Sequence, residues 1–135
     1  MAIKLSTTVR NAMLDQIETT IGTSAVLKLR TGAAPADVAT ADSGTVVATM
    51  TLPSDWMAAA SSGSKALSGT WQDTSADNAG TVGHFRIYAS DGTTKHIQGD
   101  VTATGGGGDL TLDNNVLTAG QSVSITSFTL TAGNA

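Results

Sequence analysis

Residues 84–102 read HFRIYASDGTTKHIQGDVT, and this stretch decides the fold. Phe85 and Ile87 alternate with polar residues in the first half, and Ile97 and Val101 share one face of the second half. Alternation with a period of two is typical of a β-strand that buries one face. The stretch therefore predicts two strands joined as a hairpin.

The length of the hairpin turn determines which side chains face each other. A two-residue turn at Asp91 and Gly92 would place Phe85 opposite Gln98, which mixes an apolar and a polar residue. A three-residue turn over residues 90–92, with Gly92 left-handed, places Phe85 opposite Ile97. We therefore expect the bulged three-residue turn.

Alternation recurs on both sides of the hairpin and predicts further strands. They cover residues 25–30, 45–52, 65–73, 110–112 and 122–131, with polar loops at residues 33–44 and 73–83. In the last strand, Val123 and Ile125 point one way whereas Phe128 and Leu130 point the other, which indicates either a bulge or a strand that serves two sheets. The pattern predicts a mainly β fold, an antiparallel β-sandwich or jelly-roll-like domain.

One amphipathic α-helix precedes these strands. The segment from Thr7 to Ile21 carries an apolar stripe, and polar residues fall off it. The stripe consists of Val9, Met13, Ile17 and Ile21, widened by Leu14, and the residues off it are Arg10, Asp15 and Glu18. Ser6 is the expected N-cap and Gly22 the expected terminator. We expect one domain over residues 1–135, with an arm and helix in 1–22 and the sandwich in 23–135.

Composition narrows the classes of function. The 135 residues are 40% hydrophobic and only 13% charged, and the net charge is -4. A surface so poor in charge is often covered by other proteins; the alternative is that the many Thr, Ser, Asn and Gln residues solvate it. Nucleic acid would require clustered basic residues. The chain contains no cysteine, and neither a signal peptide nor a membrane span is recognisable. We expect synthesis in a cytoplasm and no nucleic-acid or membrane partner.

No catalytic, cofactor or metal site is predicted. The tetraglycine at residues 105–108 lacks the Lys-Ser/Thr of a phosphate loop and fits an exposed turn. The only histidines, His84 and His96, fall on the face of the hairpin that also holds Arg86, whose charge opposes a bound cation. We expect that face to be solvated or interfacial, and we expect no enzymatic activity.

The two tryptophans have different contexts. Trp71 has the strand context of a core residue. Trp56, next to Met57, follows Pro53 in a crossing segment, and it could be a core plug, an anchor at a subunit interface or a platform for a sugar. We include Trp56 and Met57 among the candidate interface residues.

Six segments resemble a family of small virion structural proteins of tailed bacteriophages and their prophages. They are LDQIETTIG (14–22), VLKLRTGAAP (26–35), LPSDWMAAASSGSKALSGTW (52–71), FRIYASDGTTKHIQGDV (85–101), LTLDN (110–114) and FTLTAGNA (128–135). The DWMAAAS and FRIY segments are the most specific, and the resemblance covers nearly the whole chain. It carries over no catalytic residue.

The resemblance implies a virion protein, and within that class a capsid decoration or cement protein on the outer capsid surface. Its partners would be the major capsid protein and neighbouring copies of itself, as a homodimer or homotrimer. Candidate contacts are Ala2, Ile3, Lys4 and Leu5 in the arm and Pro35 in the loop at 33–44. The alternatives are a tail component (tube, tip or baseplate) and a receptor- or carbohydrate-binding module, in which Trp56 would stand exposed.

Overall fold

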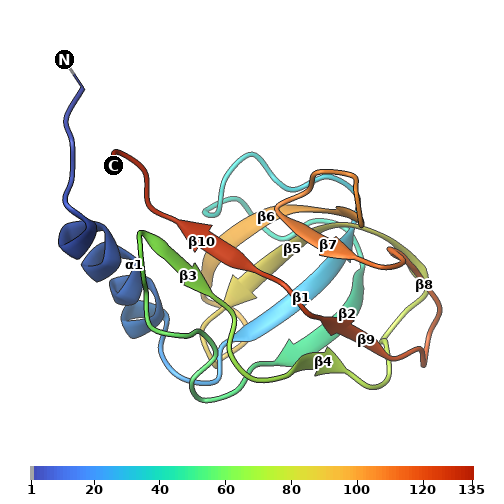
Figure 1. The fold of residues 1–135 in the computed structure, drawn as a ribbon. Coiled ribbons are helices and arrows are strands. Elements are labelled where there is room, and N and C mark those ends of the chain that lie inside the picture. The colour runs from blue at the N-terminus through green and yellow to red at the C-terminus, as the bar shows by residue number, and fades with distance from the viewer. Residues whose placement is uncertain (1) are drawn as a thin grey trace.

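A computed structural model describes residues 2–135 and shows a mainly β chain with one N-terminal helix (Figure 1). The helix is α1 (Thr7–Ile21). The strands are β1 (Val26–Thr31), β2 (Val46–Thr51), β3 (Ser64–Ala66), β4 (Trp71–Asp73), β5 (Gly80–Tyr88), β6 (Lys95–Ala103), β7 (Leu110–Leu112), β8 (Val116–Leu117), β9 (Val123–Ile125) and β10 (Thr129–Thr131).

Helix α1 begins and ends where the sequence predicts. The Ser6 side chain accepts a hydrogen bond from the backbone N–H of Val9 at 3.2 Å, which satisfies one free donor of the first turn. Gly22 follows the last turn with φ +92°, and its N–H donates to the Glu18 carbonyl at 2.9 Å. Within residues 2–135, no helix is both long and apolar enough to cross a membrane.

The main sheet has six strands and is mixed. Its order is β2-β1-β5-β6-β7, and β8 pairs with the start of β5. All pairs are antiparallel except β6 with β7, which are parallel, so the prediction of a purely antiparallel sheet is wrong at this edge. The link between β6 and β7 is short, and it contains Gly105 and Gly107 at φ +90° and +80°, a conformation that residues with side chains rarely adopt.

Two short strand pairs, β3 with β10 and β4 with β9, lie across the curled main sheet (Figure 1). The two segments predicted as single strands, 65–73 and 122–131, each split between these pairs. The phase fault in the second segment therefore reflects a chain that serves two sheets. Trp71 lies in the core between the layers, with its ring centroid 5.5 Å from that of Phe128.

The hairpin has a longer turn than we predicted. Ile87 pairs with Ile97 and Phe85 with Gly99, so the predicted pairing of Phe85 with Ile97 is wrong by two residues, although both remain on one face. The Asp91 carboxylate accepts hydrogen bonds from two backbone N–H groups of residues 93 and 94, which stabilises a turn over residues 90–93. Gly92 is left-handed at φ +70°, as predicted.

Candidate functional site

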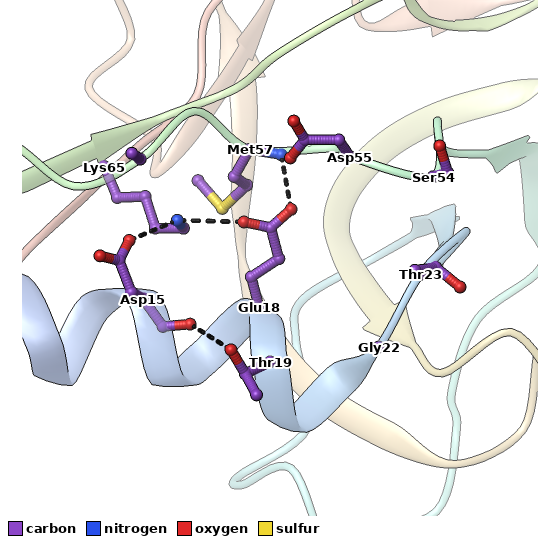
Figure 2. Close-up of a pocket in the computed structure, with 10 residues that line it drawn as sticks. Asp15, Glu18, Thr19, Gly22, Thr23, Ser54, Asp55, Met57 and Lys65 are labelled. Carbon is purple, nitrogen blue, oxygen red and sulfur yellow. Dashed lines mark hydrogen bonds and ion pairs between the residues drawn. The ribbon is translucent and has the colours of Figure 1, made fainter.

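A cleft of about 540 Å³ lies between α1 and the segment that leads into β3 (Figure 2). Its lining comes from the second half of the helix and from residues 54–65. Asp15 and Glu18 point from the helix toward Lys65, and Asp55 stands across the cleft (Figure 2). The cleft is therefore lined by three carboxylates and one amine.

Lys65 is buried at 2% exposure and uses all three of its N–H donors. Its Nζ lies 2.8 Å from Asp15 Oδ1, 3.0 Å from Glu18 Oε2 and 2.9 Å from the Ala58 carbonyl. Burial alone would lower the pKa of Lys65, but the hydrogen bonds and charges of the two carboxylates outweigh it and raise the pKa. The paired amine ties helix α1 to β3.

The polar side of α1 faces the domain. Asp15 Oδ1 also accepts from the Ala60 N–H at 2.9 Å, and Glu18 Oε1 accepts from the Met57 N–H at 3.2 Å. Asn11 Oδ1 accepts from the Gly63 N–H at 2.9 Å. These side chains satisfy backbone donors of an irregular segment that has few strand partners.

Only part of the apolar stripe of α1 packs on the domain. Leu14 and Ile21 are buried, but Val9 and Met13 are 45% and 52% exposed. The periodicity of a sequence shows that a helix is amphipathic. It does not show which face of the helix packs against its own domain. Here the ion pairs to Lys65 turn the polar face inward.

A second polar cluster lies between the main sheet and the loop at residues 33–44. Arg86 is fully buried and uses all five of its donors. They reach Gln98 Oε1 at 3.2 and 2.8 Å, the Thr40 carbonyl at 2.9 Å, Asp42 Oδ1 at 2.7 Å and the Asp37 carbonyl at 3.1 Å. The expectation that this face is solvated or interfacial is therefore wrong for Arg86 and His84, which are fully buried, whereas His96 is half-buried and lines a groove beside α1.

Asp42 is the centre of this cluster. Its Oδ2 lies 3.0 Å from Arg30 Nη2, and its Oδ1 accepts from the Tyr88 hydroxyl at 2.9 Å. Burial acts to raise the pKa of Asp42, but the hydrogen bonds from Tyr88 and Arg86 and the charges of both guanidinium groups hold it below its ordinary value. The cluster fastens the loop to the sheet.

His84 also lies on this covered face, at 0% exposure. Its Nδ1 is 2.8 Å from the Gly32 carbonyl, and its Nε2 has no hydrogen-bond partner among the described residues. Within residues 2–135, no group of three or more His, Cys, Asp or Glu side chains could hold a metal ion.

The predicted interface residues fall into two groups. Ala2, Ile3 and Lys4 are exposed and Leu5 is half-buried, in an extended arm that leads away from the domain (Figure 1). The Leu5 N–H donates to the Asn134 carbonyl at 2.6 Å, which ties the base of the arm to the C-terminal segment. The arm is thus bound to the domain at Leu5, whereas Ala2, Ile3 and Lys4 are exposed.

The remaining three residues offer less surface. Pro35 is half-buried, and its carbonyl accepts from Gln98 Nε2 at 2.7 Å. Trp56 and Met57 are 0% and 1% exposed, and Trp56 Nε1 donates to the Gly22 carbonyl at 2.9 Å. Of the three interpretations of Trp56, its position matches a residue that fills the core. Because both side chains are buried, neither Trp56 nor Met57 is exposed for contact with another molecule.

Exposed apolar residues gather on one side of the molecule. Among residues 2–135, four large apolar side chains are exposed, and three of them are Ile3, Val9 and Met13. Beside them, a groove of about 330 Å³ runs between α1 and β6, lined in part by Ile17 and Ile97. These side chains make the arm and α1 the most apolar part of the surface among the described residues.

Comparison with known proteins adds no relative. No protein-family model, no curated protein and no solved structure matches this chain. The function is therefore argued from the chain's own residues and from the resemblance stated above.

Sequence reasoning missed both polar clusters. Lys65 stands in a strand pattern that gives no sign of its two partners on the helix, since the pairs span 50 and 47 positions. Arg86 alternates with Phe85 and Ile87, and this pattern is equally typical of a solvent-facing residue. The only available signal was that the loop at residues 33–44 is long enough to cover a sheet face.

Proposed function

We propose that this chain is a non-enzymatic structural protein of a tailed-phage virion that decorates the outside of the capsid. In this role it binds the major capsid protein and neighbouring copies of itself. The observation that carries the proposal is the exposed apolar surface formed by the arm and α1, with Ile3 at 78% exposure. The resemblance of six sequence segments to a virion family supports it independently.

The exposed apolar side chains of the arm and α1 would gain free energy if another molecule covered them. Apolar area stabilises a contact by about 25 cal/mol per Å² when it leaves water, and a monomer that exposes a contiguous apolar patch forgoes this gain. The low charge content, 13% of residues, leaves few ions to desolvate when a neighbour covers the surface. Both features favour a protein whose working state is an assembly.

Many weak contacts would then act together. Each copy on a lattice contributes a modest interface, and a partner that binds only the assembled shell stabilises that shell by mass action. Because neighbouring copies are held close by the lattice, their contacts form at high effective concentration. The whole layer would resist the pressure of packaged DNA more strongly than any one contact.

The finer description of the fold belongs to this proposal too. The pairs β3 with β10 and β4 with β9 lie across the main sheet (Figure 1) and would form the second layer of a jelly-roll-like sandwich. No observation favours a receptor- or carbohydrate-binding module, because the aromatic residues that could form its platform, Trp56, Trp71 and Tyr88, are all buried.

The test is binding to particles that lack the protein. Purified chain is added to such capsids, and co-sedimentation and the temperature of DNA release are measured. We expect saturable binding and a higher release temperature. Ile3→Asp should weaken binding, whereas Val116→Asp, at a residue 55% exposed on β8, is the matched control and should bind normally. Failure to bind, or binding to tails alone, would overturn the decoration role.

A further inference from the structure

Residues 57–65 form a docking site that is complementary to the polar side of α1. Its centre is the buried ammonium of Lys65, which lies 2.8 Å from Asp15 Oδ1 and 3.0 Å from Glu18 Oε2. Around it, the backbone N–H groups of residues 57, 60 and 63 donate to side chains of the helix at 3.2, 2.9 and 2.9 Å. An empty docking site would leave the ammonium and three backbone donors without these partners, so occupation by an α1 helix is strongly favoured.

The contacts at the docking site do not specify which copy of the chain supplies the helix. Of the fifteen described residues of α1, only Leu14 and Ile21 are buried, and Ile17 packs in part on the core. The rest of the core is built from residues 25–128, so it can form before α1 docks. The α1 of a second copy carries the same side chains and would make the same contacts. Terminal elements with this property are the ones that copies of a protein can exchange.

The connection between α1 and β1 is short and strained. The Gly22 carbonyl accepts from Trp56 Nε1 at 2.9 Å, and the Ala25 carbonyl accepts from the Leu52 N–H at 2.8 Å. Between these two anchored residues lie only Thr23 and Ser24, and Ser24 is left-handed with φ +52°. A residue with a side chain adopts this conformation at a cost in free energy. Straightening the connection would release that strain.

We propose that copies of this chain exchange α1, so that the helix of each copy fills the docking site of the other. The proposal rests on the proposed function, because copies held side by side on a capsid lattice have the high effective concentration that exchange needs. The docking contacts are the same in the closed and the exchanged forms, whereas the strain at Ser24 is present only in the closed form. A short connection under strain favours exchange for this reason. The arm and the exposed side of α1 stay available to the capsid in both forms.

The short connection also determines where two copies meet. In the exchanged form, Gly22 is anchored on one copy and Ala25 on the other, and the three peptide units between them span at most about 10 Å. The start of β1 in each copy must therefore lie beside the docking site of the other, with both connections near the two-fold axis. The connection lies at the rim of the domain (Figure 1), and Thr23 is exposed, so a second copy can approach it.

Cross-linking of isotope-mixed protein tests the exchange in the native sequence. A carbodiimide joins a lysine amine to an adjacent carboxylate, and Lys65 Nζ lies within 3.0 Å of Asp15 and Glu18. Unlabelled and ¹⁵N-labelled chains are mixed in equal amounts, refolded together at high concentration and separated into monomer and dimer. In the dimer, we expect about half of the cross-linked peptide pairs between Lys65 and α1 to join a labelled to an unlabelled chain, as random pairing of two copies requires. The monomer should contain only pairs with one label.

Two serine-to-glycine variants test the role of the connection. Ser24→Gly removes the strain from the closed form, so it should lower the dimer association constant about tenfold. Ser62→Gly is the matched control, because Ser62 is also left-handed, at φ +53°, but lies outside the connection. Its strain is present in both forms, so the association constant should not change. Both constants are measured by sedimentation.

The possible outcomes separate the exchange from the decoration role. A native chain that stays monomeric at high concentration overturns the exchange, and so does a dimer whose cross-linked pairs all carry one label. Equal association constants for Ser24→Gly and the native chain also contradict it. Dimers with single-label pairs that still bind capsids overturn the exchange alone, whereas exchanged dimers that bind no capsid overturn the decoration role alone.

Discussion

Replacement of Arg86 by methionine tests whether the loop at residues 33–44 is fastened by one buried guanidinium. Methionine keeps much of the apolar volume of the arginine stem and removes all five donors. Two of the lost partners are carbonyls of the loop, and a third is the Asp42 carboxylate. The loop should then loosen, although Arg30 and Tyr88 still hold Asp42, while the core of the domain stays folded.

The loss of stability in Arg86→Met depends on the hydrogen-bond partners that remain without a donor. Removing one partner of a buried ion pair costs about 3–5 kcal/mol, but the Asp42 side chain is 35% exposed and keeps Arg30, so water and the second guanidinium recover part of that. We expect a loss of about 3 kcal/mol in the free energy of unfolding. For a domain of this size, that corresponds to a fall in Tm of roughly 10 °C.

The assay combines urea unfolding with limited proteolysis. Lys95→Met is the control, since Lys95 is a half-buried lysine on the neighbouring strand β6 and should change stability by no more than about 0.5 kcal/mol. In Arg86→Met, a protease of broad specificity should cut first within residues 33–44. If Arg86→Met unfolds at the same urea concentration as Lys95→Met, and the loop stays protected, the guanidinium does not hold the loop.

Three further predictions concern the helix, acid and one glycine. Lys65→Met should lower Tm by several degrees and increase amide exchange in α1, because Asp15 loses its ammonium partner; unchanged exchange would show that the ion pairs do not hold the helix. Hydrogen bonds lower the pKa of Asp91 and of Asp15 in the folded protein. The two ionised carboxylates therefore stabilise the fold above the unfolded aspartate pKa of about 3.9, and this stabilisation is lost as pH falls through their folded pKa values. The urea midpoint should therefore hold from about pH 7 to 5 and drop below about pH 4, and Asp91→Asn should reduce the drop; an equal drop would contradict this. Gly99→Ala should destabilise the hairpin by about 1–3 kcal/mol, since a Cβ would lie 2.7 Å from Phe85 Cε1, and an unchanged urea midpoint would refute the tight contact.

Local signals predicted the elements of this fold well. The capping residues Ser6 and Gly22 mark the ends of α1 in the sequence because capping depends on neighbouring backbone groups alone. Alternation located β1, β2, β6 and the second half of β5 for a similar reason, since a strand with one buried face repeats every two residues, whereas residues 80–83 of β5 fall in the predicted loop. The phase change between Ile125 and Phe128 likewise anticipated a segment shared by two sheets.

Long-range contacts were beyond reach of these signals. The turn of the hairpin is set by the Asp91 side chain and by the space that Gly99 leaves for Phe85, so composition of the turn alone gave the wrong register. Which face of α1 turns inward depends on Lys65, in a strand far along the chain. For the candidate surface, the sequence predicted the arm residues, and only the three-dimensional structure shows that Val9 and Met13 extend that surface.

The measurement that tests the central claim most directly is a cryo-electron microscopy reconstruction of intact virions that carry this protein. The account predicts domain-sized density repeated over the outside of the capsid shell. Density confined to the tail, or purified particles in which the protein is absent, would contradict the claim that it is a capsid decoration protein.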